Sequence, residues 1–357
     1  MKVMPAWAAL VLLTTTSLAA CSAIGEGDDA AAPATDGTIT DVVLVAHDSF
    51  SLPKKLIKQW EADTGYHLVV RASGDAGELT TKLVLTKNSP TGDLAFGVDN
   101  SFAGRALDED VFAPYDVELP AGASAFELEA DTGHTLAPID TGAVCVNVDT
   151  TWFADHDLAS PTTLDDLTDP TYRDLFVTSG APTSSPGFAF LLATIAAKGD
   201  GWQDYWTDLM ANGAKLTKGW EDAYYVDFTA GGGDSASRPI VLSYDSSPAY
   251  TVDKKTGTTS TAALLDTCSR QVEYAGVLDG AENVPGAESL LEFLLGPEVQ
   301  AALPTSMYVY PVRDDAQLPA EWSKFAQEPT TTLDVPAEEI EANRDTWLTE
   351  WSDITSR

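Results

Sequence analysis

DVVLVAHDSF, at residues 41–50, begins the stretch that decides the fold. Its first six residues are an apolar, valine-rich run, which predicts a buried β-strand. The chain up to residue 97 predicts five elements in this order: strand 41–46, helix 53–64 ended by Gly65, strand 68–71, a helix opened by residues 73–77, and strand 93–97. This β-α-β-α-β order predicts a parallel sheet wound with helices.

Acidic residues follow each of these three strands, as Asp48, Asp75 and Asp99. Because the carboxyl ends of parallel strands meet at one edge of a sheet, we expect the three loops to lie together and to form the wall of a cleft. Each aspartate taken alone is also typical of a helix N-cap or a turn.

A second α/β unit is predicted from about residue 140. The remaining elements are strand 143–148, helix 188–197, strands 240–242 and 271–278, helices 287–295 and 297–303, and a last helix at 337–352. In the last helix Ile340, Trp347 and Trp351 recur at helical spacing, so we expect them to pack in the core. A folded part of about 320 residues predicts two domains rather than one.

Residues 218–250, KGWEDAYYVDFTAGGGDSASRPIVLSYDSSPAY, crowd aromatic rings among acids and hydroxyls. The rings are Trp220, Tyr224, Tyr225, Tyr244 and Tyr250. Ring faces can clamp a small, flat cationic ligand. Packing in a core or an interface is the other interpretation of such a cluster.

Two serine pairs stand before prolines that open helices: Ser184 and Ser185, and Ser246 and Ser247. Serine at such a position is typical of an N-cap. The same hydroxyls, with the free backbone N–H groups of the helix start, can also hold a hydroxyl or a phosphate of a ligand.

The amino terminus predicts export. Lys2 precedes an apolar run at 3–18, which is short for a membrane span and suits a signal peptide at residues 1–20. The run ends in Leu-Ala-Ala-Cys, which resembles a bacterial lipobox and implies a lipid on Cys21. Residues 21–38 are expected to be a flexible tether, so the only membrane contact would be the lipid anchor. An uncleaved helix with an incidental cysteine is the alternative.

Charge and cysteine content restrict the partners. Fifty-five acidic residues against 20 basic ones give a net charge of −35, which excludes nucleic acid as a natural partner and mildly favours a cationic ligand. Once Cys21 is lipidated, only Cys145 and Cys268 remain, and they are expected to form a disulfide, with two buried free thiols as the open alternative. The four histidines are scattered, so no metal site is predicted.

The chain resembles the thiamine-binding proteins of bacterial thiamine ABC importers, which are periplasmic substrate-binding proteins of type II. The resemblance runs from about Val43 to Arg357. It depends on these motifs: HDSF at 47–50, GVDNS at 97–101, PIDTG at 138–142, TSSPG at 183–187, TKGWEDAY at 217–224, LSYDSSPAY at 242–250 and PTSMYVYPV at 304–312. Several motifs in family order are more specific than any one of them.

The resemblance implies a non-enzymatic, monomeric, two-lobed α/β protein with mostly parallel sheets flanked by helices. Lobe 1 would hold residues 39–139 and 270–357, and lobe 2 residues 140–269, with hinges at the crossings. It would close on thiamine or its phosphate esters, need no cofactor, and deliver the ligand to an ABC permease. The implied ligand-binding residues are Asp75, Ala76, Ser184, Ser185, Trp220, Tyr244, Asp245, Ser246 and Ser247, with Tyr250 and Asp48 beside them.

Three positions depart from the family pattern. Ala76 stands for a glycine, His47 for an aromatic residue, and Asp245 for a threonine. The added charge of Asp245 would discourage phosphorylated thiamine.

Two other functions remain as alternatives. A ferric-ion binding lipoprotein is suggested by the adjacent Tyr224 and Tyr225, which resemble the tyrosine ligands of such proteins. A hydrolase would have to use isolated carboxylates and serines with His47 or His134 as base, because the sequence contains no GxSxG elbow.

Overall fold

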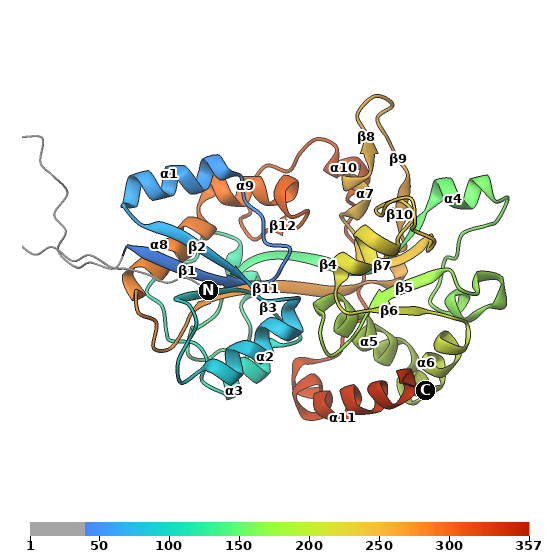
Figure 1. Ribbon diagram of the computed structural model, residues 1–357, viewed down its shortest axis with the longest axis horizontal. Helices are drawn as coiled ribbons and strands as arrows, with labels where there is room; N and C mark the ends of the chain where they lie inside the picture. The colour runs from blue at the N-terminus through green and yellow to red at the C-terminus, as the bar shows by residue number, and fades with distance from the viewer. Residues whose placement is uncertain (1–39, 357) are drawn as a thin grey trace, which may run out of the picture. The chain divides into compact units, whose positions relative to one another are not determined.

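The computed structural model describes residues 40–356 (Figure 1). The predicted signal peptide, Cys21 and the tether lie outside the described residues. Within these bounds the chain forms one compact unit. Among the described residues, no helix combines the length and the apolar character needed to cross a membrane.

One large sheet organises this unit. Its strands lie in the order β2 (His67–Ala72), β1 (Asp41–Ala46), β3 (Leu94–Asp99), β11 (Ser269–Val277), β4 (Ala137–Asp149), β7 (Ile240–Tyr244), β5 (Phe176–Ser179) and β6 (Lys215–Thr217). Two short strands, β10 (Thr261–Ala263) and β12 (Tyr310–Pro311), also pair with β4. A separate hairpin joins β8 (Val252–Asp253) and β9 (Thr258–Thr259).

The prediction of mostly parallel sheets is correct at the two ends of this sheet and wrong at its centre. β2, β1 and β3 pair in parallel, as do β7, β5 and β6. The central strands β11 and β4 are antiparallel to each other and to their neighbours β3 and β7. Each runs from one half of the sheet to the other (Figure 1), so the chain crosses between the halves through extended backbone.

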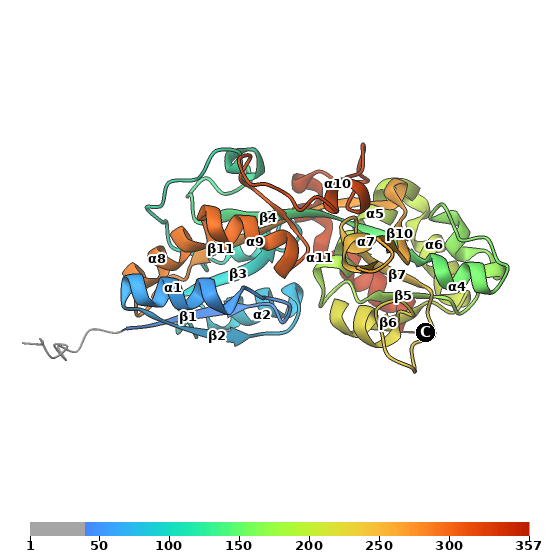
Figure 2. The same cartoon turned by 90° about the horizontal axis from the view of Figure 1, so that it is seen from above.

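Helices cover both faces of the sheet. Beside the β1 end lie α1 (Lys54–Thr64), α2 (Ala76–Thr86), α3 (Ala103–Asp108), α8 (Val284–Leu295) and α9 (Pro297–Ser306) (Figures 1 and 2). Beside the β5 end lie α4 (Thr150–Asp155), α5 (Ser185–Lys198), α6 (Trp202–Ala211), α7 (Ser247–Tyr250), α10 (Trp322–Phe325) and α11 (Ala337–Thr355). Gly65 ends α1 in the left-handed conformation, with φ 78°, as its position predicts.

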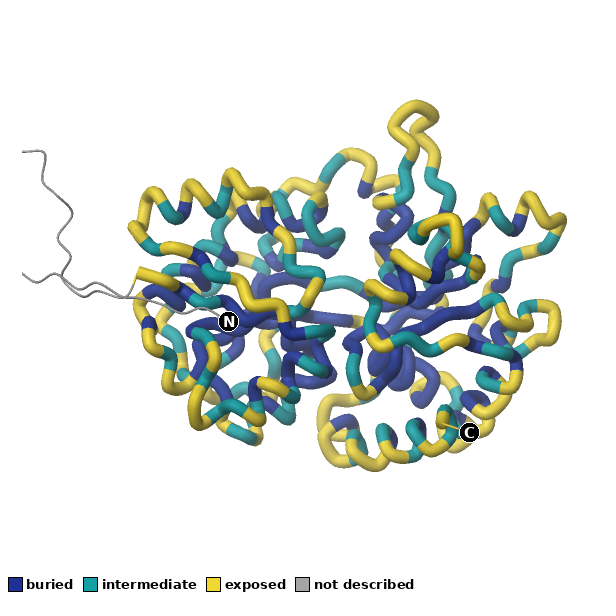
Figure 3. The backbone as a smooth tube through the Cα atoms, in the orientation of Figure 1, coloured by how far each residue is buried: buried dark blue, intermediate teal, exposed yellow. Residues whose placement is uncertain are grey.

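The core lies between the sheet and these helices (Figure 3). α5 is buried along most of its length, in keeping with its continuous apolar sequence. The stripe of Ile340, Trp347 and Trp351 is buried, which confirms the predicted core face of the last helix. Trp351 packs edge-to-face on Trp206 of α6, with ring centroids 5.4 Å apart. Because α11 packs on α6, it lies with residues 140–269 and not with lobe 1, to which it was assigned from the sequence.

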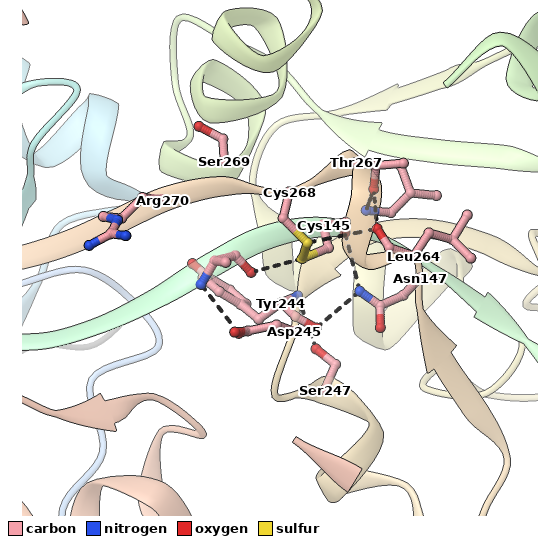
Figure 4. Close-up of a disulfide and its surroundings, with 12 residues drawn as sticks. Cys145, Asn147, Tyr244, Asp245, Ser247, Leu264, Thr267, Cys268, Ser269 and Arg270 are labelled. Carbon is pink, nitrogen blue, oxygen red and sulfur yellow. Dashed lines mark hydrogen bonds between the residues drawn. A yellow bond between two sulfur atoms is a disulfide. The ribbon is translucent and has the colours of Figure 1, made fainter. Parts of the chain in front are cut away.

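Cys145 and Cys268 form a disulfide whose Cα atoms are 4.2 Å apart (Figure 4). Cys145 lies on β4, and Cys268 directly precedes β11. The bond therefore joins the two crossing strands where they enter and leave the half of the molecule that contains β5 to β7. The two cysteines are 123 positions apart in the sequence, so the bond closes a long loop of the chain.

Candidate ligand-binding site

A cavity of about 320 Å³ lies at the edge of the sheet where the parallel strands end. Its lining comes from the loop after β1, the starts of α2 and α5, the segment after β6, the end of β7 with α7, β11, and the residues that follow α9. The volume is at the lower end of the roughly 300–1,000 Å³ typical of ligand sites. Chain segments far apart in sequence thus converge on one small cavity.

Two of the three predicted acids face this cavity. Asp48 and Asp75 line it, as expected from their place after β1 and β2. Asp99 does not line it, because it is fully buried at the end of β3. There its Oδ1 accepts hydrogen bonds from the backbone N–H groups of Ser101 and Phe102, and burial raises its pKa to about 7.

Aromatic rings form one wall. Trp220, Tyr224, Tyr225, Tyr244 and Tyr250 all line the cavity. Trp220 stacks on Tyr224 at a centroid distance of 5.0 Å, and Tyr244 meets Trp220 edge-on at 6.0 Å. Both interpretations of the cluster, core packing and ligand binding, therefore apply to different rings. Tyr224 is a core residue with 1% exposure, while the other four rings remain partly accessible.

Hydrogen bonds fix the orientation of the indole. Nε1 of Trp220 donates to Oγ of Ser243 at 3.0 Å, and that hydroxyl pairs with Oγ of Ser247 at 2.7 Å. Oγ of Ser247 also accepts from the backbone N–H of Tyr244 at 3.1 Å. The start of α7 therefore holds two of the cavity's rings in place.

The predicted serines differ in their surroundings. Ser185, Ser246 and Ser247 line the cavity. Oγ of Ser185 is buried and has no hydrogen-bond partner among the described residues, so it is available to a ligand. Ser184 is fully buried, and its Oγ donates to Oγ of Ser179 at 2.8 Å; the structure does not bring it to the cavity.

Asp75 joins the two halves of the site. Its carboxylate accepts a hydrogen bond from the backbone N–H of Trp220 at 2.9 Å and a longer one from that of Ser185 at 3.4 Å. Next to it, the backbone N–H of Gly77 donates to the carbonyl of Thr183 at 3.1 Å. Oγ of Ser49, in the loop after β1, donates at 3.1 Å to Oε1 of Glu221, in the segment after β6. The structure is therefore closed over the cavity.

Two further predicted residues lie outside the lining. Ala76 is buried, and its N–H donates to Asp75. Asp245 faces away from the cavity, because it follows Tyr244 at the strand end and side chains alternate there. Its Oδ1 accepts from the backbone N–H of Ala143 at 3.2 Å (Figure 4), and burial raises its pKa to about 7. The expected effect of Asp245 on phosphorylated ligands therefore loses its structural basis.

Sequence reasoning missed several lining residues: Ser49, Phe50, Ser51, Pro186, Glu221, Glu273, Ser306, Met307, Tyr308 and Val309. Tyr308 and its neighbours belong to the PTSMYVYPV motif, which was available as a signal. Glu273 had a weaker signal, as a carboxylate within the otherwise apolar strand QVEYAGVL.

The cavity is acidic. Its described lining includes Asp48, Asp75, Glu221 and Glu273, and contains no lysine or arginine. Among residues 40–356, no group of three or more His, Cys, Asp or Glu side chains is arranged to hold a metal ion. Burial raises the pKa of Tyr225 to about 12, and burial likewise raises the pKa of Tyr224.

Known proteins resemble this chain over nearly its whole folded part. The family model for bacterial extracellular solute-binding proteins matches residues 89–330. The thiamine-binding periplasmic protein of Salmonella typhimurium strain LT2 is 30% identical over 321 residues, which cover 88% of this chain and 94% of that protein.

Solved structures show the same likeness. A periplasmic thiamin binding protein superposes with a TM-score of 0.75 at 26% identity, covering 89% of this chain and 96% of its own. The ferric binding protein from Campylobacter jejuni shares the fold, with a TM-score of 0.67 at 18% identity over 88% of this chain and 99% of its own. On this match of sequence and fold, the chain belongs to the family of bacterial extracellular solute-binding proteins.

Proposed function

We propose that this protein captures thiamine outside the cytoplasm and delivers it to the permease of an ABC importer. The observation that carries the proposal is the combination of an aromatic wall and four carboxylates in one closed cavity. Thiamine has a flat aminopyrimidine ring and a thiazolium cation. Such a ligand gains from ring stacking and from cation–π and charge interactions together.

The relatives support the same ligand, because those with the higher sequence identity, 30% and 28% over most of the chain and 26% for a solved structure, are thiamine-binding proteins, whereas the ferric binding protein is 18% identical. The unpartnered hydroxyl of Ser185 at the start of α5 suits the hydroxyethyl group of thiamine. Unphosphorylated thiamine is expected to bind more tightly than its esters, because the described lining supplies acids and no lysine or arginine to a phosphate.

Calorimetric titration with thiamine, its monophosphate, its diphosphate and ferric citrate tests the proposal. Truncation of a central aromatic anchor typically costs about 2 kcal/mol or more, which is roughly a thirtyfold loss of affinity. We therefore expect Trp220→Ala to weaken thiamine binding at least tenfold. Wild-type affinity in that variant would remove Trp220 from the site, and binding of iron with no heat from thiamine would favour the ferric alternative.

The anchoring of the protein is part of the same proposal. We infer that the mature protein begins at Cys21, carries a lipid there, and works as a monomer beside its permease. Replacement Cys21→Ala should release the protein from the membrane fraction or leave the precursor unprocessed. Lipid labelling that persists in this variant would contradict the inference.

A further inference from the structure

His47 and Glu273 form an ion pair in the wall of the cavity. Nε2 of His47 lies 3.5 Å from Oε1 of Glu273, and the two side chains are only 11% and 9% exposed. Gly97 permits this arrangement, because a Cβ atom there would overlap the imidazole. The ring also packs against Phe96, with centroids 5.3 Å apart. The imidazole is therefore held beside the carboxylate.

Acidic groups surround this pair. In the strand register Glu273 lies opposite Asp140 of β4 on one side and Asp99 of β3 on the other. The other titratable groups that interact with the pair are Asp48, Asp75 and Tyr244. Among the described residues that line the cavity, His47 is the one side chain that can carry a positive charge near neutral pH.

The surroundings determine where the protons reside. Burial alone would lower the pKa of His47, but the charge of Glu273, with smaller contributions from Asp75 and Asp48, raises it above the ordinary value. Burial alone would raise the pKa of Glu273, but the neighbouring His47, which favours the carboxylate form, lowers it. Burial and the charge of Glu273 raise the pKa of Asp140 well above its usual range.

The wall consequently has two charge states, which differ by the proton of His47. With His47 protonated, the His47–Glu273 pair is neutral overall. When His47 loses its proton, the wall gains one net negative charge at a place where both side chains of the pair are largely buried. A positively charged ligand interacts better with the second state, because like charges repel strongly at low dielectric.

We propose that capture of a cationic ligand in this cavity is coupled to release of the proton of His47, so that the His47–Glu273 pair sets the pH dependence of binding. The inference rests on the proposed function, in which the thiazolium of thiamine supplies the cation. By linkage the ligand and the proton weaken each other's binding by the same factor, typically about 5- to 150-fold. Affinity for thiamine should therefore rise as the pH increases through the pKa of His47.

Nuclear magnetic resonance of the imidazole groups tests this directly, because the chain has only four histidines. His47 is assigned by its loss in His47→Gln. We expect it to titrate above the ordinary histidine value in the ligand-free protein and to titrate lower with saturating thiamine. His134 is a matched control: it lies 3.8 Å from Glu127 but is 74% exposed, and its resonances should not respond to thiamine.

Calorimetry gives a second readout. Titration of thiamine in buffers of different ionisation enthalpy between about pH 6.5 and about pH 8 should report proton release and an increase in affinity of about fivefold or more. Glu273→Gln should reduce the release and flatten the pH profile, because burial then lowers the pKa of His47 against only the smaller opposing charges of Asp75 and Asp48.

The outcomes separate the two proposals. Thiamine binding without proton release, or with an unchanged His47 titration, overturns this inference alone. A His47 midpoint below the ordinary value in the ligand-free protein overturns it whether or not thiamine binds. Absence of any thiamine binding overturns the proposed function and this inference with it.

Discussion

Gly77 offers a way to test closure without touching the groups that line the cavity. It is the second residue of α2, and its Cα packs against the backbone of Pro182 and Thr183 in the loop before α5. A Cβ atom there would come 2.7 Å from the carbonyl oxygen of Pro182, whereas ordinary contact begins at 3.4 Å. In Gly77→Ala the two segments must therefore separate by about 0.7 Å, which is the difference between these distances.

That separation removes two hydrogen bonds. Gly77 and Glu78 donate to the carbonyl of Thr183 at 3.1 and 3.3 Å, and neither bond survives such an increase. At a net value of about 1 kcal/mol for each bond, closure loses about 2 kcal/mol, or roughly thirtyfold in affinity. The helix itself should gain up to about 1 kcal/mol, because alanine replaces glycine.

The expected result is weaker thiamine binding by calorimetry, faster dissociation by stopped flow, and a melting temperature of the ligand-free protein that is unchanged or higher. Gly104→Ala is the matched control, because Gly104 is also helical and nothing lies within 4 Å of a Cβ atom there. Affinity of Gly77→Ala within about threefold of wild type would refute the view that this contact closes the site.

Three other predictions concern stability. Trp347→Ala should lower the free energy of unfolding by about 3–5 kcal/mol and leave thiamine affinity unchanged in calorimetry; a loss of affinity in the folded variant would contradict its role in the core. Removing the disulfide by serine substitution of both Cys145 and Cys268 should cost about 2–5 kcal/mol in denaturant unfolding, and an unchanged midpoint would count against the bond. Asp99→Asn should gain stability relative to wild type as the pH rises, by up to about 4 kcal/mol. The reason is that the pKa of Asp99 is raised to about 7 in the folded protein, so the wild type is stabilised by the protonated carboxyl. This contribution is complete below pH 4 and is lost as the pH rises through 7. A stability difference that stays constant from pH 4 to pH 8 would exclude this sign.

The sequence predicted correctly those elements whose conformation depends on local residue preferences. DVVLVA forms a strand over the six residues expected, and Gly65 ends α1 because it accepts a left-handed backbone. The central antiparallel pairing was not predictable in this way. The direction in which β4 and β11 cross depends on contacts between residues about 130 positions apart, such as Val272 with Thr141.

The site shows the same division. Asp48, Asp75 and Trp220 could be found because motifs with a local structural meaning carry them. Asp245 was misplaced because a motif does not say to which side of a strand end a side chain points. Glu273 was missed because its role comes from strand register, which places it between β3 and β4.

The interactions that shape the cavity divide into two groups with different dependence on closure. Glu273 lies on β11, one of the strands that cross between the halves of the sheet, and Asp140 lies opposite it on the other. Their separation is fixed by sheet hydrogen bonds. The hydrogen bonds of Asp75 with Trp220 and of Gly77 with Thr183 instead join loops and helix starts from different halves. Separation of the two halves must break these bonds, whereas the pairing of β11 with β4, which positions Glu273 and Asp140, can persist. We therefore expect a cationic ligand to meet the carboxylate of Glu273 before the aromatic wall and Asp75 enclose it. The binding free energy should then combine charge interactions that do not need closure with the hydrogen bonds and ring stacking that do.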